Sequence, residues 1–413
     1  AADKQDKVLN VPTLRFPEYS DKWLECELQD IADFSKGAGI SKDQLSETGE
    51  SCILYGELYT KYKSEVISNV ISKTDIENSN LVRSKANDVI IPSSGETAID
   101  ISTARCVPFD NILLGGDLNI IRLKDQDGRF FSYQLNGVRK LDIAQIAQGV
   151  SVVHLYGESL KRLKVRYPSK SEQEKVSSLL SLIDERIETQ NRIIAQLQSL
   201  ITGLNNNLMD NLSWENVQVG DFMDFYSTNF LSWEQLDYKQ GEVKNLHYGL
   251  IHSGLPTLID CGLCSLPNIK DEFLPKQYTL CEDGDVAFAD ASEDTNEVGK
   301  AVEIYDCRDL SVVCGLHTIH GRDKANATIV GFKGFAFNAK YFHDQLRRIA
   351  QGSKIYSIST DNVKSCYLRI PSKSEQKQVV RLLSAYLQKI DIAEQELNAY
   401  QVQKQYLLKT MFV

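Results

Sequence analysis

Nine cysteines and six histidines are the side chains of this 413-residue sequence best suited to metal binding or nucleophilic chemistry. Cys261 and Cys264 form its only Cys-x-x-Cys spacing, and four further candidate ligands follow: Cys307, Cys314, His317 and His320. A structural zinc site needs two such pairs brought together. The cysteines are odd in number and widely scattered, which favours reduced thiols over a disulfide framework. We interpret the thiols as buried and the histidines as packing residues, and we expect no bound metal.

The motifs of nucleotide and methyl-transfer chemistry are missing from the sequence. Gly299-Lys300 is followed by Ala301, so it does not complete a phosphate-binding loop, and Gly115-Gly116 is too short for a dinucleotide fingerprint. There is no Pro-Pro dipeptide, as the (Asp/Asn/Ser)-Pro-Pro-(Tyr/Phe) motif of amino-methyltransferases requires, and no H-E-x-x-H. We therefore predict no catalytic residues and no cofactor bound by this chain.

The composition is that of a folded globular protein, with 42% hydrophobic and 25% charged residues. At roughly 150 residues per domain, the length corresponds to two or three domains. No run of about 18 uncharged apolar residues and no apolar leader occurs, so we expect a cytoplasmic protein. The net charge of −10 excludes a wholly basic nucleic-acid binder, so any DNA contact must come from local patches or a partner.

An internal repeat organises the chain. Tyr167–Val176 (YPSKSEQEKV) recurs 203 residues later as Ile370–Val379 (IPSKSEQKQV), and Ala147-Gln148-Gly149 recurs at the same offset as Ala350-Gln351-Gly352. Fainter matches in the same order relate Trp23–Phe34 to Trp214–Phe225 and Asn87–Ile90 to Gly284–Ala287. The Pro-Ser-Lys-Ser-Glu-Gln segment is a helix-start signal, with Ser171 and Ser374 as the expected caps.

A heptad pattern follows each helix start. Its first copy is Val176, Leu180, Ile183, Ile187, Ile194, Leu197, Ile201, Leu204 and Leu208, with Gln190 in one polar position. Its second copy is Val379, Leu383, Tyr386, Ile390, Ala393, Leu397, Tyr400, Leu407 and Met411, with Lys404 as the polar position. Two stripes in the same register predict an antiparallel coiled-coil pair of helices, each of about 36 residues and roughly 54 Å.

Apolar residues beside each stripe make it wider than a two-helix contact requires, and a wider stripe predicts docking of partner subunits. These candidate partner-binding residues are Leu179, Ile193, Leu200, Leu382, Leu387 and Leu408.

We predict an α+β fold in which two duplicated α/β-mixed domains, residues 1–168 and 211–371, are joined by two long helices, residues 169–210 and 372–413, with pseudo-two-fold symmetry. Within the domains, strand patterns occur at Leu118–Leu123, Val286–Ala289 and Ala327–Val330. A helix is expected near Ile71–Ile76.

Duplicated domains, each followed by a long helix that starts with Pro-Ser-x-x-Glu-Gln, resemble the specificity subunit of type I restriction-modification systems over essentially the whole chain. The resemblance is carried by Tyr167–Gln173 and Ile370–Gln376, together with the Asp88-Val89 and Gly284-Asp285-Val286 strand starts and the two Ala-Gln-Gly turns. It implies a non-catalytic, sequence-specific DNA-binding subunit, whose two target-recognition domains each read one half of a bipartite target.

The same resemblance implies that the helices scaffold two methyltransferase subunits and that motor-nuclease subunits join the complex. S-adenosylmethionine, ATP and Mg would then be bound by these partners. A 54 Å spacer limits the separation of the half-sites to at most roughly 16 base pairs. Because the chain is acidic, we expect the methyltransferase subunits to supply much of the phosphate binding, and the isolated chain to bind DNA weakly.

Candidate DNA-contacting residues lie in polar loops with basic, amide or hydroxyl side chains, the groups that read base edges. They are Lys36, Lys61, Lys63, Ser93, Ser94, Thr97, Arg105, Gln148 and Ser151 in the first domain, and His252, Asn296, Lys300, His317, Arg322, Lys324, Lys354 and Tyr356 in the second. Two alternatives remain open: a nuclease or methyltransferase in its own right, which would need a cofactor or metal motif, and a coiled-coil scaffold that links two protein-binding modules.

Overall fold

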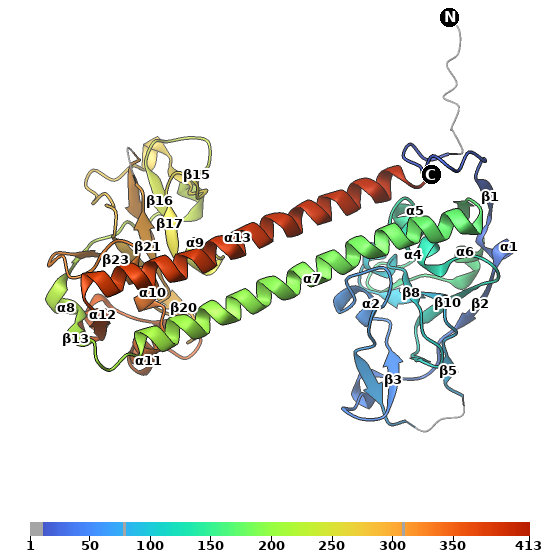
Figure 1. The fold of residues 1–413 in the computed structure, drawn as a ribbon, viewed down its shortest axis with the longest axis horizontal. Coiled ribbons are helices and arrows are strands. Elements are labelled where there is room, and N and C mark those ends of the chain that lie inside the picture. The colour runs from blue at the N-terminus through green and yellow to red at the C-terminus, as the bar shows by residue number, and fades with distance from the viewer. Residues whose placement is uncertain (1–10, 77–79, 308–309) are drawn as a thin grey trace, which may run out of the picture. The chain divides into compact units, whose positions relative to one another are not determined.

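The computed structural model describes residues 11–76, 80–307 and 310–413 of the chain. The chain divides into two compact units: unit 1 extends to Arg192 and includes Gln395–Val413, and unit 2 is Ile193–Glu394 (Figure 1). Each unit therefore contains one globular part and a section of both long helices. In the described ranges, no helix combines the length and apolarity needed to cross a membrane.

The globular part of unit 1 is built on two four-stranded sheets. One has the strand order β2-β10-β6-β8 with all neighbours antiparallel, and the other has the order β4-β3-β9-β5 with a parallel β3–β9 pair. Short ladders join β1 to β12 and β7 to β11. The strands are β1 (Leu24–Glu27), β2 (Ala32–Lys36), β3 (Glu50–Ile53), β4 (Ser72–Thr74), β5 (Val82–Arg83), β6 (Asp88–Pro92), β7 (Ser94–Gly95), β8 (Arg105–Val107), β9 (Leu113–Leu114), β10 (Leu118–Leu123), β11 (Val153–His154) and β12 (Lys164–Tyr167). The helices are α1 (Leu28–Ile31), η1 (Lys42–Gln44), α2 (Glu57–Thr60), α3 (Ala98–Ile101), α4 (Gly128–Asn136), α5 (Lys140–Ile146) and α6 (Gly157–Lys161).

Unit 2 repeats this plan with a longer sheet of order β14-β23-β19-β21-β17 and a second sheet of order β15-β18-β16-β22. Its strands are β13 (Glu215–Gln218), β14 (Met223–Tyr226), β15 (Leu236–Asp237), β16 (Lys244–Leu246), β17 (Leu258–Asp260), β18 (Asn268–Ile269), β19 (Val286–Ala289), β20 (Ala291–Ser292), β21 (Ala301–Tyr305), β22 (Val312–Cys314), β23 (Thr318–Asp323), β24 (Tyr356–Ser357) and β25 (Tyr367–Ile370). Its helices are α8 (Val219–Phe222), η2 (Trp233–Gln235), α9 (Tyr248–His252), η3 (Asp271–Phe273), α10 (Phe332–Phe337), α11 (Lys340–Ile349) and α12 (Thr360–Ser365).

The repeat seen in the sequence is a repeat of structure. In unit 1 the Arg122 side chain donates two hydrogen bonds to Asp88, at 2.8 and 2.7 Å, and in unit 2 Arg322 donates to Asp285 at the same distances. The amide of Gly115 donates to the last residue of β3, and the amide of Gly315 donates to the last residue of β16, both at 2.9 Å. Matching hydrogen bonds at matching places confirm two copies of one unit.

A glutamine from the repeated helix start fastens each long helix to its globular part. The Gln173 side chain donates to Pro168 O at 2.9 Å and accepts from the amide of Asp127 at 3.1 Å. Gln376 donates to Pro371 O at 2.9 Å and accepts from the amide of Ile329 at 2.8 Å. Both glutamines are fully buried, so these bonds satisfy groups that water cannot reach.

The N-caps of the two long helices lie two residues earlier in the chain than predicted from the sequence. Helix α7 begins at Lys170 and helix α13 at Lys373, so Ser171 and Ser374 lie inside the first turn. Ser372 caps α13: its hydroxyl accepts from the amide of Glu375, and the Glu375 carboxylate accepts in return from the amide of Ser372 at 3.1 Å. This is a capping box, and Ser372 rather than Ser374 occupies its first position.

The two long helices, α7 (Lys170–Met209, 40 residues) and α13 (Lys373–Thr410, 38 residues), pack together along the predicted seam. In unit 1, Asp184 contacts Lys404 while Gln190 contacts Glu396, so the helices run antiparallel. Val176, Leu180 and Leu407 join the core of unit 1. In unit 2, Leu204 and Leu208 of α7 share a core with Val379 and Leu383 of α13. The packed pair is confirmed, and each helix is slightly longer than the predicted 36 residues.

Lys404, the polar residue of the second heptad stripe, is held in a buried cluster of charges. Its ammonium group contacts Glu65 and lies 2.6 Å from Asp184. The Tyr133 hydroxyl donates to Asp184 at 2.7 Å. Burial opposes the charged ammonium, but the two carboxylates outweigh burial and raise the pKa of Lys404. A cation is therefore fixed at one level of the helix pair.

Two local predictions were wrong. Residues 71–76 contain strand β4 rather than a helix, because Ser72–Thr74 pairs with β3. Residues 327–330 form a turn rather than a strand. There the Asp323 carboxylate accepts hydrogen bonds from the amides of Ala327 and Thr328, and Gly331 (φ 92°) occupies the N-cap position immediately before α10. The first conformation is decided by pairing with a strand about twenty residues earlier, and the second by an aspartate four to five residues before the turn.

Candidate functional site

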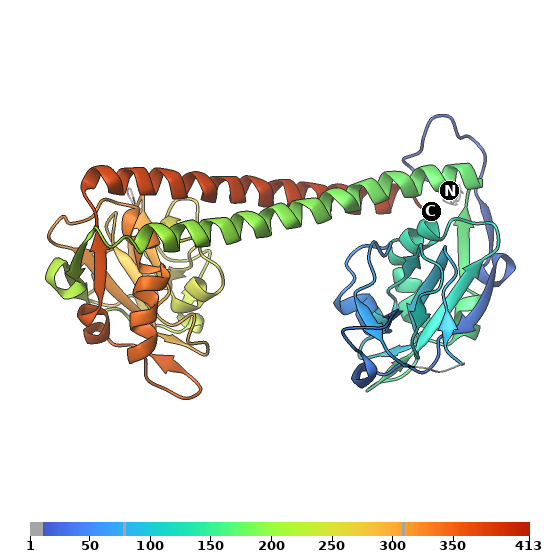
Figure 2. The same ribbon diagram turned by 60° about the horizontal axis from the view of Figure 1, so that its bottom comes forward.

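Each unit carries an exposed hairpin at its Ala-Gln-Gly repeat: residues 148–154 in unit 1 and 351–357 in unit 2. Gln148 and His154 exchange two backbone hydrogen bonds, at 2.9 and 2.7 Å. Gln351 and Ser357 do the same at 3.0 and 2.8 Å. The glycine after each glutamine has a positive φ, 126° at Gly149 and 138° at Gly352, so the turn needs glycine there. Figure 2 shows the second hairpin projecting beyond the end of α11.

The two hairpins share a backbone but expose different side chains. The first exposes Val150, Ser151 and Val152, and the second exposes Ser353, Lys354 and Ile355. Val150 is 96% exposed and Ile355 is 60% exposed. Exposed aliphatic side chains grouped on one turn mark a candidate contact surface, because much of their apolar area stays in water in the chain as it stands.

The first hairpin packs beside β7, and three of the predicted DNA-contacting residues lie in or next to that strand: Ser93, Ser94 and Thr97. His154 pairs with Ser94 in the β11–β7 ladder, and the amide of Leu155 donates to Ser93 O at 2.9 Å. Ser93 and Ser94 are buried, so the structure leaves their side chains little room to meet a ligand. Thr97 is exposed, and its hydroxyl caps α3 by accepting from the amide of Asp100 at 3.1 Å.

In unit 2 the structure brings four predicted residues together around the β20–β24 ladder. Tyr356 pairs with Ser292, and the His252 ring bonds Ala291 O at 2.9 Å. Lys300 forms an ion pair with Glu297 at 2.9 Å, and the His252 ring lies 3.9 Å from the same carboxylate. The rings of Tyr248 and His317 are 5.1 Å apart, which completes a polar and aromatic surface. In the sequence Tyr248 stands out only through the repeat match of Tyr248-Gly249 to Tyr55-Gly56, and only the fold places its ring against those of His252 and His317.

His317 sits on the tight turn between β22 and β23 with a left-handed backbone (φ 55°). Its ring lies 3.0 Å from the Asp290 carboxylate. Burial raises the pKa of Asp290, while the nearby His317 ring opposes the rise. The pair fixes the direction of the imidazole at the edge of the surface.

Several of the basic residues predicted to contact DNA form ion pairs with carboxylates of the same chain. Lys61 pairs with Glu57 at 2.7 Å, and Lys324 pairs with Asp224 at 2.9 Å. Arg322 holds Asp285 and also donates to Glu282 at 2.6 Å. Because Arg122 holds Asp88 in the same way in unit 1, the Arg322 side chain serves the fold at this position. Strand β23 runs from Thr318 to Asp323, so His317 lies just before its first residue and Lys324 just after its last. Lys324 is therefore one strand length away from His317.

Arg105 is the clearest correction among the candidates. It is only 7% exposed, and its guanidinium donates to the carbonyl oxygens of Leu58 at 3.0 Å and Tyr62 at 2.9 Å. A buried guanidinium bonded to backbone carbonyls holds the chain together and cannot reach a base edge. The remaining exposed candidates are Lys36, Lys63, Gln148, Ser151, Asn296 and Lys354.

The helix surface also differs in part from the predicted partner-binding set. Ile193, Leu200 and Leu382 are exposed. Leu179 and Leu408 instead pack against the core of unit 1, and Leu387 packs against that of unit 2. Heptad counting missed four exposed apolar residues on the helices: Leu182, Ile392, Val402 and Tyr406. The sequence does not show which faces of the helices are covered by the globular parts. It therefore cannot separate the exposed apolar residues from those that pack against a core.

Comparison with known proteins identifies the class. A family model described as the type I restriction modification DNA specificity domain matches residues 20–199 and 308–400, which is more than half of the chain. The chain belongs to this family. It is a non-catalytic DNA-specificity component of a type I restriction-modification system, as the resemblance in its sequence implied.

Two solved structures show the same fold. The type I restriction-modification S subunit from M. genitalium has 17% sequence identity and a TM-score of 0.61, and the match covers 98% of this chain and 99% of that one. A chain from a structural study of the assembly and conformational transition of the type I system has 13% identity and a TM-score of 0.58, over 94% and 97% of the two chains.

Proposed function

We propose that each unit reads one half of a bipartite DNA target and that the hairpins at 148–154 and 351–357 are part of the reading surface. The observation that carries the proposal is the pair of hairpins, equal in backbone and different in exposed side chains. Two readers of different half-sites need a common way of meeting DNA and different groups at the point of contact. The target-recognition domains would be residues 1–168 and 211–371, and the spacer helices residues 169–210 and 372–413.

The test exchanges the hairpin tips. Residues 149–153 and 352–356 are equal in length, so each tip can be placed on the other hairpin without changing its closure. The altered chain is assembled with its methyltransferase subunits, and the methylated sequences are mapped. We expect a change confined to one half-site for each exchange. An unchanged target in both exchanges would remove the hairpins from the reading surface.

Single substitutions refine this test. Lys354→Ala removes an exposed cation from the second hairpin, and Ser151→Ala removes a hydroxyl from the first. For a base contact, each substitution should relax one position of the target and cost about 1–3 kcal/mol of discrimination. Lys409→Ala, an exposed residue at the end of α13, is the matched control and should leave the target unchanged.

The charge of the chain supports a shared DNA interface. With a net charge of −10 and several of its surface cations paired, the chain offers little attraction for phosphate. We propose that two methyltransferase subunits supply most of the phosphate contacts. These subunits would also bind S-adenosylmethionine, and motor-nuclease subunits would bind ATP and Mg. The isolated chain should bind its target weakly. Nanomolar binding by the isolated chain in physiological salt would contradict this division of labour.

The exposed apolar residues of α7 and α13 are the proposed contact for these partners. Leu382→Asp should weaken co-purification with the methyltransferase subunit, because a charge would be buried at the interface. Gln388→Asp introduces the same carboxylate on another face of α13 and serves as the control. Equal co-purification of both variants would place the partner elsewhere.

A further inference from the structure

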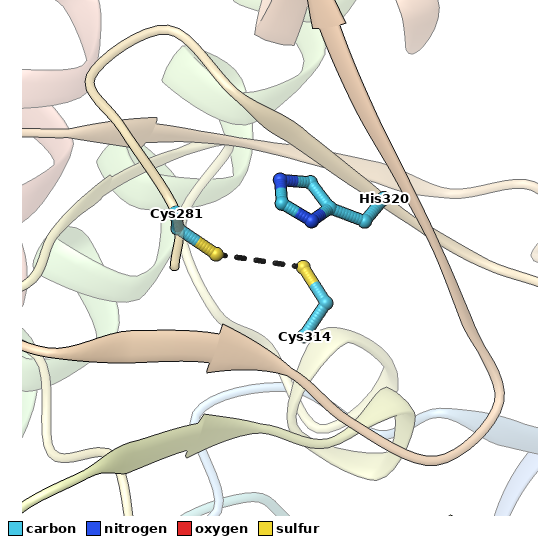
Figure 3. A group of neighbouring side chains, drawn as sticks. All are labelled: Cys281, Cys314 and His320. Atoms are coloured by element: carbon cyan, nitrogen blue, oxygen red, sulfur yellow. Dashed lines mark hydrogen bonds between the residues drawn. The ribbon is translucent and has the colours of Figure 1, made fainter. Parts of the chain in front are cut away.

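A buried group of three potential metal ligands lies in unit 2, apart from the hairpin surface. Cys281, Cys314 and His320 place two Sγ atoms and an imidazole nitrogen within 4.8 Å of one another. All three side chains are buried, and Figure 3 shows the ring facing the two sulfur atoms. Cys281 was not singled out in the sequence, because it lies outside any Cys-x-x-Cys spacing.

The fold explains why the two thiols meet. The amide of Cys281 donates to Val312 O in β22 at 2.8 Å, so Cys281 lies alongside that strand. Side chains two residues apart on a strand point to the same face, so Cys314 lies on the same side as Val312. The Sγ atoms of Cys281 and Cys314 are 3.7 Å apart. Two thiolates bound about 2.3 Å from a tetrahedral zinc ion lie about 3.8 Å from each other.

That distance alone is not sufficient, because Cys261 and Cys307 approach to 3.8 Å in the same unit. The deciding observation is the ring of His320, which is 1% exposed. Its Nε2 lies 2.7 Å from the Asp285 carboxylate, which accepts from Nε2–H. Its Nδ1 is buried and has no hydrogen-bond partner. In the neutral ring with Nε2 protonated, this Nδ1 carries a free lone pair directed at the two sulfurs.

Asp285 completes the arrangement that metal-binding histidines usually have. A ligating imidazole commonly donates its other N–H to a carboxylate, which fixes the tautomer and the ring orientation. Asp285 is itself held by Arg322 through two hydrogen bonds. The carboxylate is therefore fixed before any ion binds.

Unit 1 shows what the same place looks like without ligands. The amide of Ser84 donates to Ile112 O at 2.8 Å, as that of Cys281 does to Val312 O. Leu114 precedes Gly115 as Cys314 precedes Gly315, and Ile120 lies two residues before Arg122 as His320 lies before Arg322. Leu114 and Ile120 share one apolar cluster. The duplicated fold is therefore stable here with Ser, Leu and Ile, so the Cys/Cys/His set is not required by packing.

We propose that unit 2 binds one zinc ion through Cys281 Sγ, Cys314 Sγ and His320 Nδ1. Binding displaces one proton from each thiol, so two thiolates balance the charge of Zn²⁺ and the site stays neutral. The fourth position of a tetrahedral ion is left to an exogenous ligand. The ion joins β22 of one sheet to β23 of the other, beneath the turn that carries His317. It would hold that turn in place without taking part in catalysis.

The test measures metal in the purified, reduced, full-length chain. We expect elemental mass spectrometry to find one zinc ion per chain. After exchange for Co²⁺, we expect visible d–d bands of tetrahedral cobalt and a near-ultraviolet thiolate-to-cobalt band. Hydrogen exchange of the turn at 315–317 should become faster when a chelator removes the ion.

The decisive variant carries Cys281→Ser, Cys314→Leu and His320→Ile, the residues that unit 1 has at these places. It should fold and contain no zinc. Cys261→Ser with Cys307→Ser removes the other close thiol pair and should keep the zinc, as should Cys366→Ala. The proposal is overturned if the reduced chain contains no zinc and gives no cobalt spectrum, or if the triple variant keeps its zinc. It is also overturned if the chain binds only Cu⁺. The same holds if mass spectrometry shows Cys281 and Cys314 joined as a disulfide, with the mass of the chain lower by two hydrogens.

Discussion

At the scale of single residues, Lys404 shows how one side chain stabilises the helix pair. Lys404→Met would leave the buried carboxylate of Glu65 and the largely buried carboxylate of Asp184 without the cation that contacts both. Removing one partner from a buried ionic group typically costs about 3–5 kcal/mol. We expect a loss of this size in the unfolding free energy of unit 1 in urea at neutral pH. Burial raises the pKa of Asp184, so the loss should become smaller as the pH falls and Asp184 takes up a proton. Lys409→Met should change it by less than about 0.5 kcal/mol. A loss below about 1 kcal/mol for Lys404→Met would contradict the role of the cluster.

His247 gives a pH dependence at the same scale. The ring is buried, its Nδ1 accepts from the amide of Gly249 at 3.1 Å, and burial lowers its pKa to about 4 from 6.5. The unfolded chain therefore takes up a proton near pH 6.5, which the folded chain resists until about pH 4. Stability should fall as pH falls through this window, by at most about 3 kcal/mol. Asparagine can accept the same amide hydrogen bond, so His247→Asn should flatten this part of the stability curve. Parallel curves for the two proteins would show that His247 does not contribute.

At the scale of elements, the hairpins depend on their glycines. A Cβ at Gly352 would lie 1.9 Å from Ile355 O, and one at Gly149 would lie 2.1 Å from Val152 O. Gly352→Ala should open the second hairpin, at a local cost of about 1–3 kcal/mol. The measurement is faster hydrogen exchange at the amides of Gln351 and Ser357, with weaker methylation of the cognate target. Gly254 also has a positive φ but open space around it, so Gly254→Ala controls for backbone strain alone. Slow exchange retained in Gly352→Ala would mean that the hairpin tolerates a Cβ.

At the scale of the whole molecule, the proposed spacer makes a prediction about target geometry. Deleting residues 187–193 of α7 together with residues 395–401 of α13 removes one heptad from each helix and keeps the seam in phase. Each helix becomes shorter by about 10.5 Å, which corresponds to roughly three base pairs. We expect the two half-sites to keep their sequences and move closer by that amount, as read by mapping methylated DNA. Removing four residues from each helix instead breaks the phase and should prevent assembly. If the heptad variant kept the original spacing of the half-sites, helix length would not determine that spacing.

The sequence by itself determined the duplication, the two long helices and the seam that joins them. These features are local and periodic: a heptad pattern depends on side chains three and four residues apart, and a repeated segment is recognised without its surroundings. The repetition also marked the helix starts and the two Ala-Gln-Gly turns, but the burial of Gln173 and Gln376 and the closure of the hairpins are seen only in the structure.

Only the tertiary structure decided which polar side chains are free to act. Arg105 and Lys354 look alike in sequence, yet one is enclosed by backbone carbonyls and the other is exposed on a hairpin. Cys281, Cys314 and His320 meet because β22 and β23, which belong to different sheets, pack together with the segment that carries Cys281, and no spacing along the chain encodes that meeting. Burial and partner choice depend on contacts between residues far apart in sequence, and these form only when the units fold.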